Sequence, residues 1–329
     1  MSTIKKIAEL ANVSSATVSR ALNNSGYVSD EVRKRILKII EETGYVPSEY
    51  AKALRTKQSK VVGVILPKIS TETSSRIVSG MDEELKKVGY QILLANTNLD
   101  RDKEVEYLNL LKSRQVDGII LVATNINDQL VKEINQLKIP IVVLGQEIPN
   151  TLSVIYDDYN AAKELTTYLI NMGHSKIGFI GVDESDPAVG YLRKKAYIDV
   201  MEQHGFQIAS SWVQKGIFDI GSGYNSMKNI IENSKEKPTA VFAVTDRLAI
   251  GAKKYLQENG HSIPKDMALV GIGASEMSAY ITPSLTTVDY KNEEAGRAAV
   301  QLLLNNLNGN DKKTKKIIAD YRLIIRDSV

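Results

Sequence analysis

The chain has 329 residues, 43% of them hydrophobic and 25% charged, which supports two or three globular domains and excludes a disordered chain. It contains no cysteine, which excludes disulfides, thiol nucleophiles and cysteine-ligated metals and fits a reducing compartment. The net charge of the chain is +3. Residues 1–60 hold 11 basic and 6 acidic residues, whereas the remainder holds 31 basic and 33 acidic residues. A basic N-terminal segment is typical of a nucleic-acid-binding module, although a solvated basic surface would have the same composition.

The opening of the sequence does not predict an export signal. The opening MSTIKKIAELANVS lacks an apolar signal core, and no apolar run further along approaches the length of a membrane span. We therefore expect a cytoplasmic protein without a membrane partner.

The first 47 residues predict three short helices. Apolar residues at helical spacing over 4–11 predict the first helix, and Asn12 and Ser14 predict a tight turn followed by an N-cap. The third helix starts after Ser29 and ends at Gly44, a residue that favours the C-terminal end of a helix. Beyond Pro47, residues 49–55 predict one more short helix, which a polar linker follows.

From residue 61 onward, short β-branched runs alternate with helical segments. The runs cover 61–67, 90–97, 118–123, 140–145, 153–158, 176–182, 240–245, 267–273 and 285–290. Continuously apolar strands between helices are typical of parallel sheets that helices cover on both faces. Nine strands are too many for one sheet, so we expect two doubly wound subdomains that face each other across a cleft.

The second predicted helix has the character of a DNA-reading helix. Short polar residues and an arginine occupy its outer face, and bulky apolar residues there would prevent entry into the major groove. Arg20 is long enough to reach a guanine edge, whereas Thr17 and Ser19 suit phosphate contacts. A purely structural three-helix bundle would show a similar pattern, so the pattern alone leaves both interpretations open.

The segment TIKKIAELANVSSATVSRALNNSGYVSDEVRKRILKIIEETGYVPSEYAKALRTKQSKVVGVI resembles the start of LacI-type (lac repressor family) bacterial transcription regulators. The resemblance continues through DGIIL, YDDYNAA, MGHSKIGFIG, AVTDRLAIGA and PSLTTVDY, and so covers essentially the whole chain. Within the family, the chain looks most similar to repressors of sucrose or trehalose utilisation. The resemblance implies an all-α helix-turn-helix DNA-binding headpiece and an α/β, periplasmic-binding-protein-like body of two doubly wound parallel-sheet subdomains.

The same resemblance implies domain boundaries. We expect a helix-turn-helix domain over 1–47 and a hinge helix with its linker over 48–60. The N-terminal effector subdomain is expected to comprise 61–158 and 289–315, and the C-terminal effector subdomain 159–288 and 316–329.

The resemblance also implies DNA contacts, made by a homodimer on a pseudo-palindromic double-stranded operator. The positions that match base-reading residues are Ser15, Ala16 and Arg20, and those that match phosphate contacts or their neighbours are Thr17, Ser19 and Asn23. In the hinge helix, the minor-groove positions are Ala51 and Leu54. Leu54 matches an apolar wedge that opens the central base step. Ser48, Glu49 and Tyr50 depart from the family pattern and weaken the details of these hinge contacts.

Polar and aromatic residues near strand ends predict an effector site in the cleft. The candidates after the first strand are Lys68, Ser70, Thr71 and Ser74, and those placed by the resemblance are Gln146, Tyr156, Arg193, Phe218, Thr245, Asp246 and Tyr280. An aromatic face with polar groups around it suits a sugar. Each candidate also has a structural interpretation: Asp246 could cap a helix, Arg193 could pair with a carboxylate, and Phe218 could belong to the core.

Two positions depart from the pattern that reads sugar hydroxyls in the lac repressor. Gln146 and Gly273 stand where ligand-binding aspartates are expected, so the cleft loses two carboxylates. Lys68, Arg76 and Arg193 remain as cations around it. This composition is compatible with a phosphorylated sugar and equally with a neutral disaccharide.

No catalytic constellation is visible. The three histidines are scattered, and the sequence has neither an H-E-x-x-H nor a G-x-S-x-G motif nor a Walker loop, so we expect no enzyme, cofactor or metal. The sequence predicts a sugar-controlled repressor of a carbohydrate-utilisation operon. Two alternatives stay open: control by a phosphocarrier protein docked near Arg76 and 297–307, or by a non-sugar effector. A sugar-binding transport protein would leave residues 1–60 unexplained.

Overall fold

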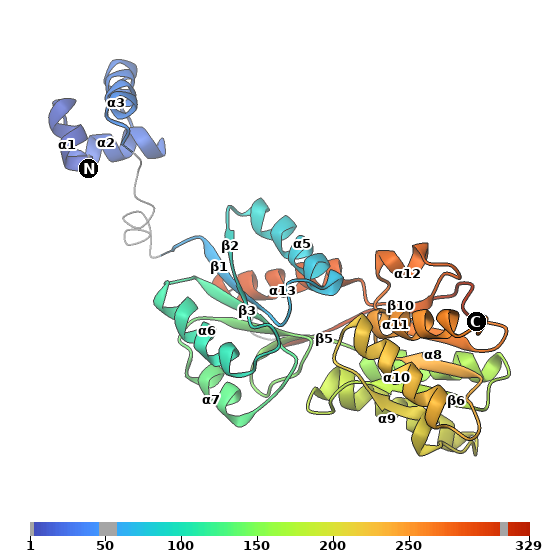
Figure 1. Cartoon of the computed structure of the whole chain (residues 1–329). Helices are drawn as coiled ribbons and strands as arrows, with labels where there is room; N and C mark the ends of the chain where they lie inside the picture. The colour runs from blue at the N-terminus through green and yellow to red at the C-terminus, as the bar shows by residue number, and fades with distance from the viewer. Residues whose placement is uncertain (1–2, 46–57, 310–314) are drawn as a thin grey trace. The chain divides into compact units, whose positions relative to one another are not determined.

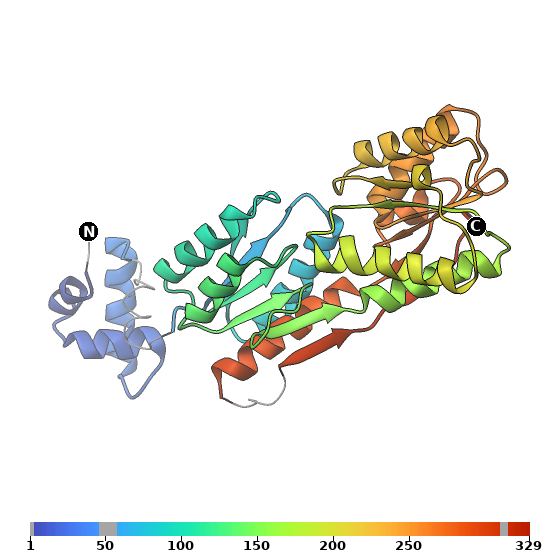
Figure 2. The same ribbon diagram turned by 90° about the horizontal axis from the view of Figure 1, so that it is seen from below.

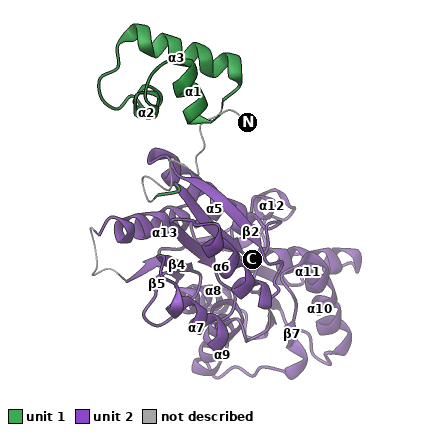
Figure 3. Ribbon diagram, turned by 90° about the vertical axis from the view of Figure 1, so that its left-hand side faces the viewer, with its two compact units in different colours: residues 1–59 green, residues 60–329 purple. Residues whose placement is uncertain are grey.

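The computed structural model describes residues 3–45, 58–309 and 315–329. The predicted minor-groove residues Ala51 and Leu54 lie outside these ranges. The chain divides into two compact units, Met1–Ser59 and Lys60–Val329, drawn in green and purple in Figure 3. Each unit is described separately below.

The first unit contains the three predicted helices, α1 (Ile4–Leu10), α2 (Ser15–Asn23) and α3 (Asp30–Thr43). Ser14 caps α2 by accepting a 3.1 Å hydrogen bond from the Thr17 backbone N–H. Asn12 adopts the left-handed conformation in the turn before it, and left-handed Gly44 ends α3, both as predicted. The helices enclose a small core made of Ile7, Ala8, Ala11, Val18, Ala21 and Ile36.

The second unit is built from two lobes, each around a six-stranded sheet (Figure 1). We call the first the N-lobe; its strand order is β11-β5-β4-β3-β1-β2 and every pair is parallel. Its strands are β1 (Val61–Leu66), β2 (Gln91–Asn96), β3 (Gly118–Val122), β4 (Ile141–Leu144), β5 (Leu152–Tyr156) and β11 (Lys316–Ala319). Its helices are α5 (Glu72–Lys87), α6 (Asp102–Ser113), α7 (Asp128–Gln136) and α13 (Asn292–Leu307).

The second lobe, the C-lobe, has the strand order β12-β10-β9-β8-β6-β7, and only the β10–β12 pair is antiparallel. Its strands are β6 (Ile177–Gly181), β7 (Val213–Lys215), β8 (Ala240–Ala243), β9 (Ala268–Ile272), β10 (Thr286–Asp289) and β12 (Arg322–Ile324). Its helices are α8 (Asp158–Asn171), π-helix η1 (Pro187–Leu192), α9 (Arg193–Gln203), 3₁₀ turn η2 (Ser210–Trp212), α10 (Ile220–Asn233), α11 (Asp246–Glu258) and α12 (Glu276–Tyr280).

Helices cover both faces of the N-lobe sheet because its strands are apolar on both faces. Val62 and Val64 pack toward α5 and α13, whereas Ile65 packs toward α6 and α7. Helix α13, late in the chain, lies beside the much earlier α5 (Figure 1). The two lobes separate clearly in Figure 2. All nine predicted strands are present, in two doubly wound sheets as expected.

One expected boundary differs from the structure. The segment 316–329 was assigned to the C-terminal subdomain, but β11 pairs with β5 in the N-lobe and only β12 joins the C-lobe. The strands β7, β11 and β12 were not predicted. Each has only three or four residues and lies at a sheet edge, where the apolar run is too short to be recognised.

Two glycines allow α5 and α13 to touch through their backbones. A Cβ atom on Gly80 would lie 2.0 Å from the Glu293 carbonyl oxygen, and one on Gly296 would lie 2.2 Å from the Ile77 carbonyl oxygen. Only residues without side chains fit this crossing, which fixes α13 on the N-lobe.

Gly80→Ala is therefore expected to lower the free energy of unfolding by about 1–3 kcal/mol, because the helices must move apart to admit a methyl group. Urea denaturation of the full chain, followed by circular dichroism, would measure this loss. Ser79→Ala, an exposed position on the same helix, is the matched control and should be neutral. Equal stability of both variants would contradict the proposed close packing.

Candidate functional site

The exposed face of α2 is the candidate nucleic-acid interface. Val18 and Ala21 are buried against the other two helices, whereas Ala16 and Arg20 are exposed on the opposite side. Since an α-helix repeats every 3.6 residues, this places Ala16 and Arg20, two of the three predicted base-reading residues, on one outward face. All predicted α2 residues lie within the helix, namely Ser15, Ala16, Thr17, Ser19, Arg20 and Asn23.

Several polar groups near this face already have partners. The Thr17 hydroxyl lies 3.0 Å from the Ser14 hydroxyl, and the Asn23 amide donates to the Ser19 carbonyl oxygen at 2.7 Å. These contacts order the helix and leave Arg20 as its long exposed cation. Tyr27, which the sequence reasoning did not single out, is 90% exposed just beyond α2. An exposed aromatic at a loop tip is a further candidate for contact with a partner.

A cavity of about 240 Å³ lies between the N-lobe and the C-lobe and receives residues from both. Nine of the eleven predicted effector residues line it, namely Lys68, Thr71, Ser74, Gln146, Tyr156, Arg193, Phe218, Thr245 and Asp246. Much of the remaining wall is apolar, with contributions from Val122, Leu144, Val189, Ile220, Ile250 and Ile272. The carboxyl ends of the parallel strands thus form the site, as expected for such sheets.

The other two predicted residues do not reach the cavity. Ser70 is exposed and is not part of the cavity wall. Tyr280 is 81% exposed because it lies at the end of the five-residue helix α12, on its solvent side. Their role as effector contacts stays a prediction, and Met277 of α12 lines the cavity.

Arg193 belongs to a buried ion pair in the cavity wall. Its Nε atom donates to the Asp158 carboxylate at 2.6 Å, and its Nη1 atom donates to the Val244 carbonyl oxygen. The Tyr290 hydroxyl also donates to Asp158, at 3.0 Å, and the Tyr290 ring lies beside the guanidinium. The positive charge of Arg193 is therefore compensated within the protein.

Asp246 is likewise held by protein donors. Its carboxylate accepts hydrogen bonds from the Thr287 hydroxyl at 2.6 Å and from the Ser275 backbone N–H at 2.7 Å. Burial raises its pKa, which these donors oppose. The cap of α11 is Thr245 rather than Asp246, and the absence of a side chain at Gly271 leaves room for the carboxylate.

Gln146 and Asp186 meet across the cavity from opposite lobes. The Gln146 Nε2 amide follows β4 in the N-lobe and donates to Asp186 Oδ1 at 2.8 Å. The same oxygen accepts from the backbone N–H groups of Ala188 and Val189 at the start of η1. Burial raises the pKa of Asp186 to about 6, against these donors. Asp186 was not among the predicted effector residues. The sequence does contain a signal for it, because Asp186 directly precedes Pro187 in the segment that follows the buried strand β6.

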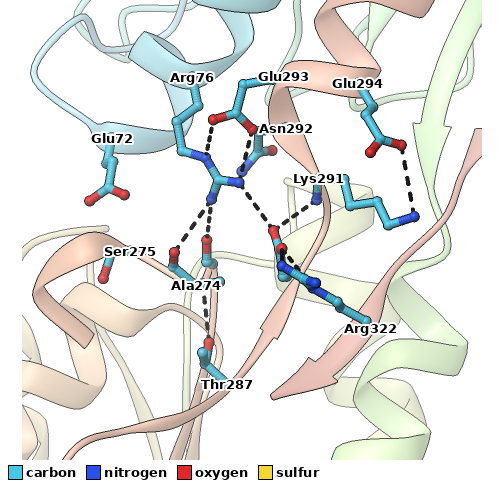
Figure 4. A network of polar contacts seen from close by, with 12 residues as sticks. Glu72, Arg76, Ala274, Ser275, Thr287, Lys291, Asn292, Glu293, Glu294 and Arg322 are labelled. Atoms are coloured by element: carbon cyan, nitrogen blue, oxygen red, sulfur yellow. Dashed lines mark hydrogen bonds and ion pairs between the residues drawn. The ribbon is translucent and has the colours of Figure 1, made fainter. Parts of the chain in front are cut away.

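A second polar network joins the lobes beside the cavity (Figure 4). Arg76 on α5 donates to both carboxylate oxygens of Glu293, at 2.8 and 2.9 Å, and to Asp289 at 3.2 Å. It also reaches the carbonyl oxygens of Gly273 and Ala274 in the C-lobe, each at 3.4 Å. The hydrogen bonds to Glu293 are the largest cause that raises the pKa of Arg76.

One turn before Arg76, the Glu72 carboxylate accepts the Glu276 backbone N–H at the start of α12, at 2.7 and 2.9 Å. Helix α5 therefore binds the C-lobe at two successive turns. We call these contacts of Glu72 and Arg76 the α5 tether. Because the tether lies beside the cavity, a change in the angle between the lobes would strain it.

Glu104 is a buried acid on the N-lobe side of the cleft. It accepts a 2.7 Å hydrogen bond from Asn125 Nδ2, and burial raises its pKa to about 7 despite that bond. Arg101, just before α6, contacts the Ser185 hydroxyl of the C-lobe. Glu104 is thus a titrating group close to a contact between the lobes.

Glu104→Gln is expected to stabilise the protein above neutral pH. The folded-state pKa lies above the ordinary value of 4.5, so the wild-type protein loses stability as the pH rises from about 4.5 to about 7. The variant keeps an acceptor for Asn125 without the charge, and should gain about 1–3 kcal/mol at pH 8 and little at pH 5. Urea midpoints at the two pH values would measure this, with exposed Glu106→Gln as the control. A gain that does not depend on pH would contradict the titration of Glu104.

Within residues 3–45, 58–309 and 315–329, no group of three or more His, Asp or Glu side chains is arranged to hold a metal ion. The helices in these ranges include none long and apolar enough to cross a membrane.

Comparisons with known proteins match both units. Residues 3–48 match the model of bacterial regulatory proteins of the lacI family, and residues 166–329 match a periplasmic binding protein-like domain. The NTD biosynthesis operon regulator NtdR of Bacillus subtilis (strain 168) is 33% identical over 100% of both chains. Catabolite control protein A of Priestia megaterium is 31% identical over 99% of this chain and 98% of its own.

Solved structures agree with this assignment. The transcriptional regulator CelR in complex with cellobiose is 26% identical, with a TM-score of 0.76 over 100% of both chains. The lac repressor dimer bound to operator and an anti-inducer has a TM-score of 0.89 at 22% identity, over 99% of this chain and 98% of its own, and supports the fold. These relatives are transcriptional regulators and not enzymes. The chain belongs to the lacI family of bacterial regulatory proteins and is a transcriptional repressor of that family.

Proposed function

We propose that the protein is a homodimeric repressor of a carbohydrate-utilisation operon, controlled by a sugar bound in the cavity between its lobes. The observation that carries this proposal is the cavity itself, which both lobes line and which holds nine residues predicted as effector contacts. A ligand held by both lobes favours the relative orientation of the lobes that it binds best, and the same chain carries the helix α2 that is proposed to read DNA.

For DNA, the proposal assigns base reading to Ser15, Ala16 and Arg20 of α2. The exposed guanidinium of Arg20 suits a bidentate contact with guanine in the major groove. Thr17, Ser19 and Asn23 are proposed to contact phosphates or to support the helix. Ala51 and Leu54 are proposed to enter the minor groove, with Leu54 as the wedge; the resemblance to the family supports these two roles.

For the effector, the cavity suits a sugar with or without a phosphate group. Two of the three cations expected around the cleft are compensated, Arg193 by Asp158 and Arg76 by Glu293 and Asp289. A phosphate group needs uncompensated Arg or Lys side chains or free backbone N–H groups. Lys68 and Arg247 line the cavity without an ion pair among the described residues, and the buried Arg247 Nε atom has no hydrogen-bond partner there. The pairing of Arg76 also weighs against the alternative in which a phosphocarrier protein docks on that residue.

Control is proposed to run through the angle between the lobes. The effector contacts both lobes and either competes with the α5 tether or reinforces it. The resulting change in the angle between the lobes shifts the N-lobes of the dimer and the hinge segments that follow the headpieces. By linkage, the effector weakens operator binding by the same factor by which the operator weakens effector binding. A sugar-binding transport protein is not supported, because residues 3–48 match a DNA-binding family.

Fluorescence anisotropy with a pool of pseudo-palindromic operator fragments tests the proposal. The titrants are sucrose, trehalose, their 6-phosphates, and glucose and fructose phosphates. Loss of DNA binding with one unphosphorylated sugar supports a sugar-released repressor. Tight DNA binding that none of these sugars changes would indicate a different effector or a protein partner instead. Release only by a phosphorylated sugar would identify a sugar phosphate as the effector.

A further inference from the structure

The wall of the cavity contains two cations that form no ion pair in the part of the chain that the structure describes. Lys68 follows β1 in the N-lobe, and Arg247 lies in the first turn of α11 in the C-lobe. Within the same described residues, the Arg247 Nε atom is buried without a hydrogen-bond partner. A buried N–H group of a guanidinium that lacks an acceptor is unfavourable, so a ligand that supplies an acceptor would bind more tightly.

The position of Arg247 in its helix favours an anion as that acceptor. The start of an α-helix carries a partial positive charge, so a cation in the first turn of α11 is unfavourable in the free protein. An anion beside the guanidinium would offset this repulsion and would also supply the missing acceptor. A planar guanidinium can bind a carboxylate or a phosphate group through two parallel hydrogen bonds.

Lys68 and Arg247 lie near the same carboxylate, although they come from opposite lobes. The pKa of Asp219 is lowered mainly by the hydrogen bond from the Ser222 backbone N–H, at 2.6 Å, and further by the charges of Lys68 and Arg247. Asp219 caps α10 through that hydrogen bond and forms no ion pair with either cation among the described residues. One carboxylate near two cations leaves a positive charge that a ligand can compensate.

The acids of the cavity wall do not take up this charge. Three of them are bound by donors of the protein itself, namely Asp158 by Arg193, Asp246 by Thr287 and Ser275, and Glu72 by the Glu276 backbone N–H. The fourth, Asp186, accepts the Gln146 amide with Oδ1, whereas its Oδ2 is buried without a partner in the described ranges. An anionic ligand that also carries a hydroxyl or amino group can donate to Oδ2, so Asp186 and Arg247 together suit a ligand that has both kinds of group.

We infer that the ligand of this cavity carries an oxyanion, a carboxylate or a phosphate group, that binds between Arg247 and Lys68, and that Arg247 makes the site prefer acidic compounds over their neutral analogues. Because the two cations come from different lobes, the oxyanion also favours the arrangement of the lobes in which both cations reach it. This inference rests on the proposed function, because it names the chemical class of the ligand of the same cavity.

Three compounds with the same sugar ring test this preference in the full-length protein. Glucose, glucuronate and glucose 6-phosphate differ at carbon 6, which is neutral in the first and carries an oxyanion in the other two. Ligand-observed NMR titration at constant ionic strength should give at least one anion an affinity about tenfold or more above that of glucose, because its contact with Arg247 is charge-assisted. Whichever anion binds more tightly identifies the oxyanion as a carboxylate or a phosphate group. Equal or weaker binding of both anions overturns the inference, and so does the absence of binding by both up to about 50 mM.

Arg247→Gln assigns the preference to this side chain. Glutamine keeps a polar side chain that suits a helix, but it removes the charge. The affinity for the preferred anion should fall at least about tenfold, and the preference over glucose should disappear. Lys254→Gln removes the same charge from an exposed position of α11 outside the cavity, and should leave the affinity unchanged. An equal loss in both variants, or no loss in Arg247→Gln, overturns the inference.

The comparison of the three compounds needs only the wild-type protein, so it tests the inference even if Arg247→Gln does not fold, which circular dichroism would reveal. Operator release is scored separately by fluorescence anisotropy. Anion binding that needs Arg247, with an operator that none of the sugars or sugar phosphates releases, would overturn only the proposed function. Operator release by a neutral sugar that is equally effective in wild type and Arg247→Gln would overturn only the inference.

Discussion

Replacement of Arg193 by methionine is expected to lower the free energy of unfolding by about 3–5 kcal/mol, the typical loss when one partner of a buried ion pair is removed. Asp158 is 2% exposed and would keep a buried charge, with the Tyr290 hydroxyl as its one remaining side-chain donor among the residues that the structure describes. Methionine retains most of the volume, so the loss would report the charge and not a cavity. Urea denaturation of the full chain at pH 7.5, followed by circular dichroism, would measure it.

Two further variants separate the ion pair from other effects. The double variant Asp158→Asn with Arg193→Met removes both charges and should recover much of the lost stability, since no uncompensated charge remains. Lys194→Met, next in the chain, removes an ion pair between partly exposed side chains, Lys194 and Glu184, and should change stability by less than about 1 kcal/mol. A loss below about 1 kcal/mol for Arg193→Met would indicate that the guanidinium is available to a ligand, as the sequence suggested.

The fold could be predicted largely from the sequence because its signals are local. Nine apolar strands and the caps Ser14 and Gly44 are visible in short windows, and each was found where expected. The strands that were missed, β7, β11 and β12, depend on pairing with a distant neighbour. β11, for example, gains its place only from β5, more than 150 residues earlier in the chain.

The sequence could predict which residues line the candidate site, but not which hydrogen bonds and ion pairs their side chains form. Strand ends and the resemblance placed nine residues at the cavity, yet neither could show that Arg193 and Asp246 are satisfied within the protein. Pairing of side chains depends on the distance between groups far apart in sequence. Asp186 escaped notice for the same reason: its importance arises from Gln146, 40 residues away on the other lobe.

Arg20→Ala is expected to weaken binding to the best operator by about 10- to 100-fold and to leave binding to random DNA nearly unchanged, because a bidentate arginine–guanine contact contributes about 1–3 kcal/mol of discrimination. Arg20 is exposed on α2, opposite buried Val18 and Ala21, so its removal should not unfold the headpiece. Selection from a randomised pseudo-palindromic library, followed by anisotropy on the selected and random fragments, would measure both affinities. Arg20→Lys is the matched control, since it keeps the charge without the planar fork and should lose discrimination while it retains most of the salt-dependent affinity. If Arg20→Ala selects the same sequence as the wild-type protein with the same discrimination, α2 does not read bases through Arg20.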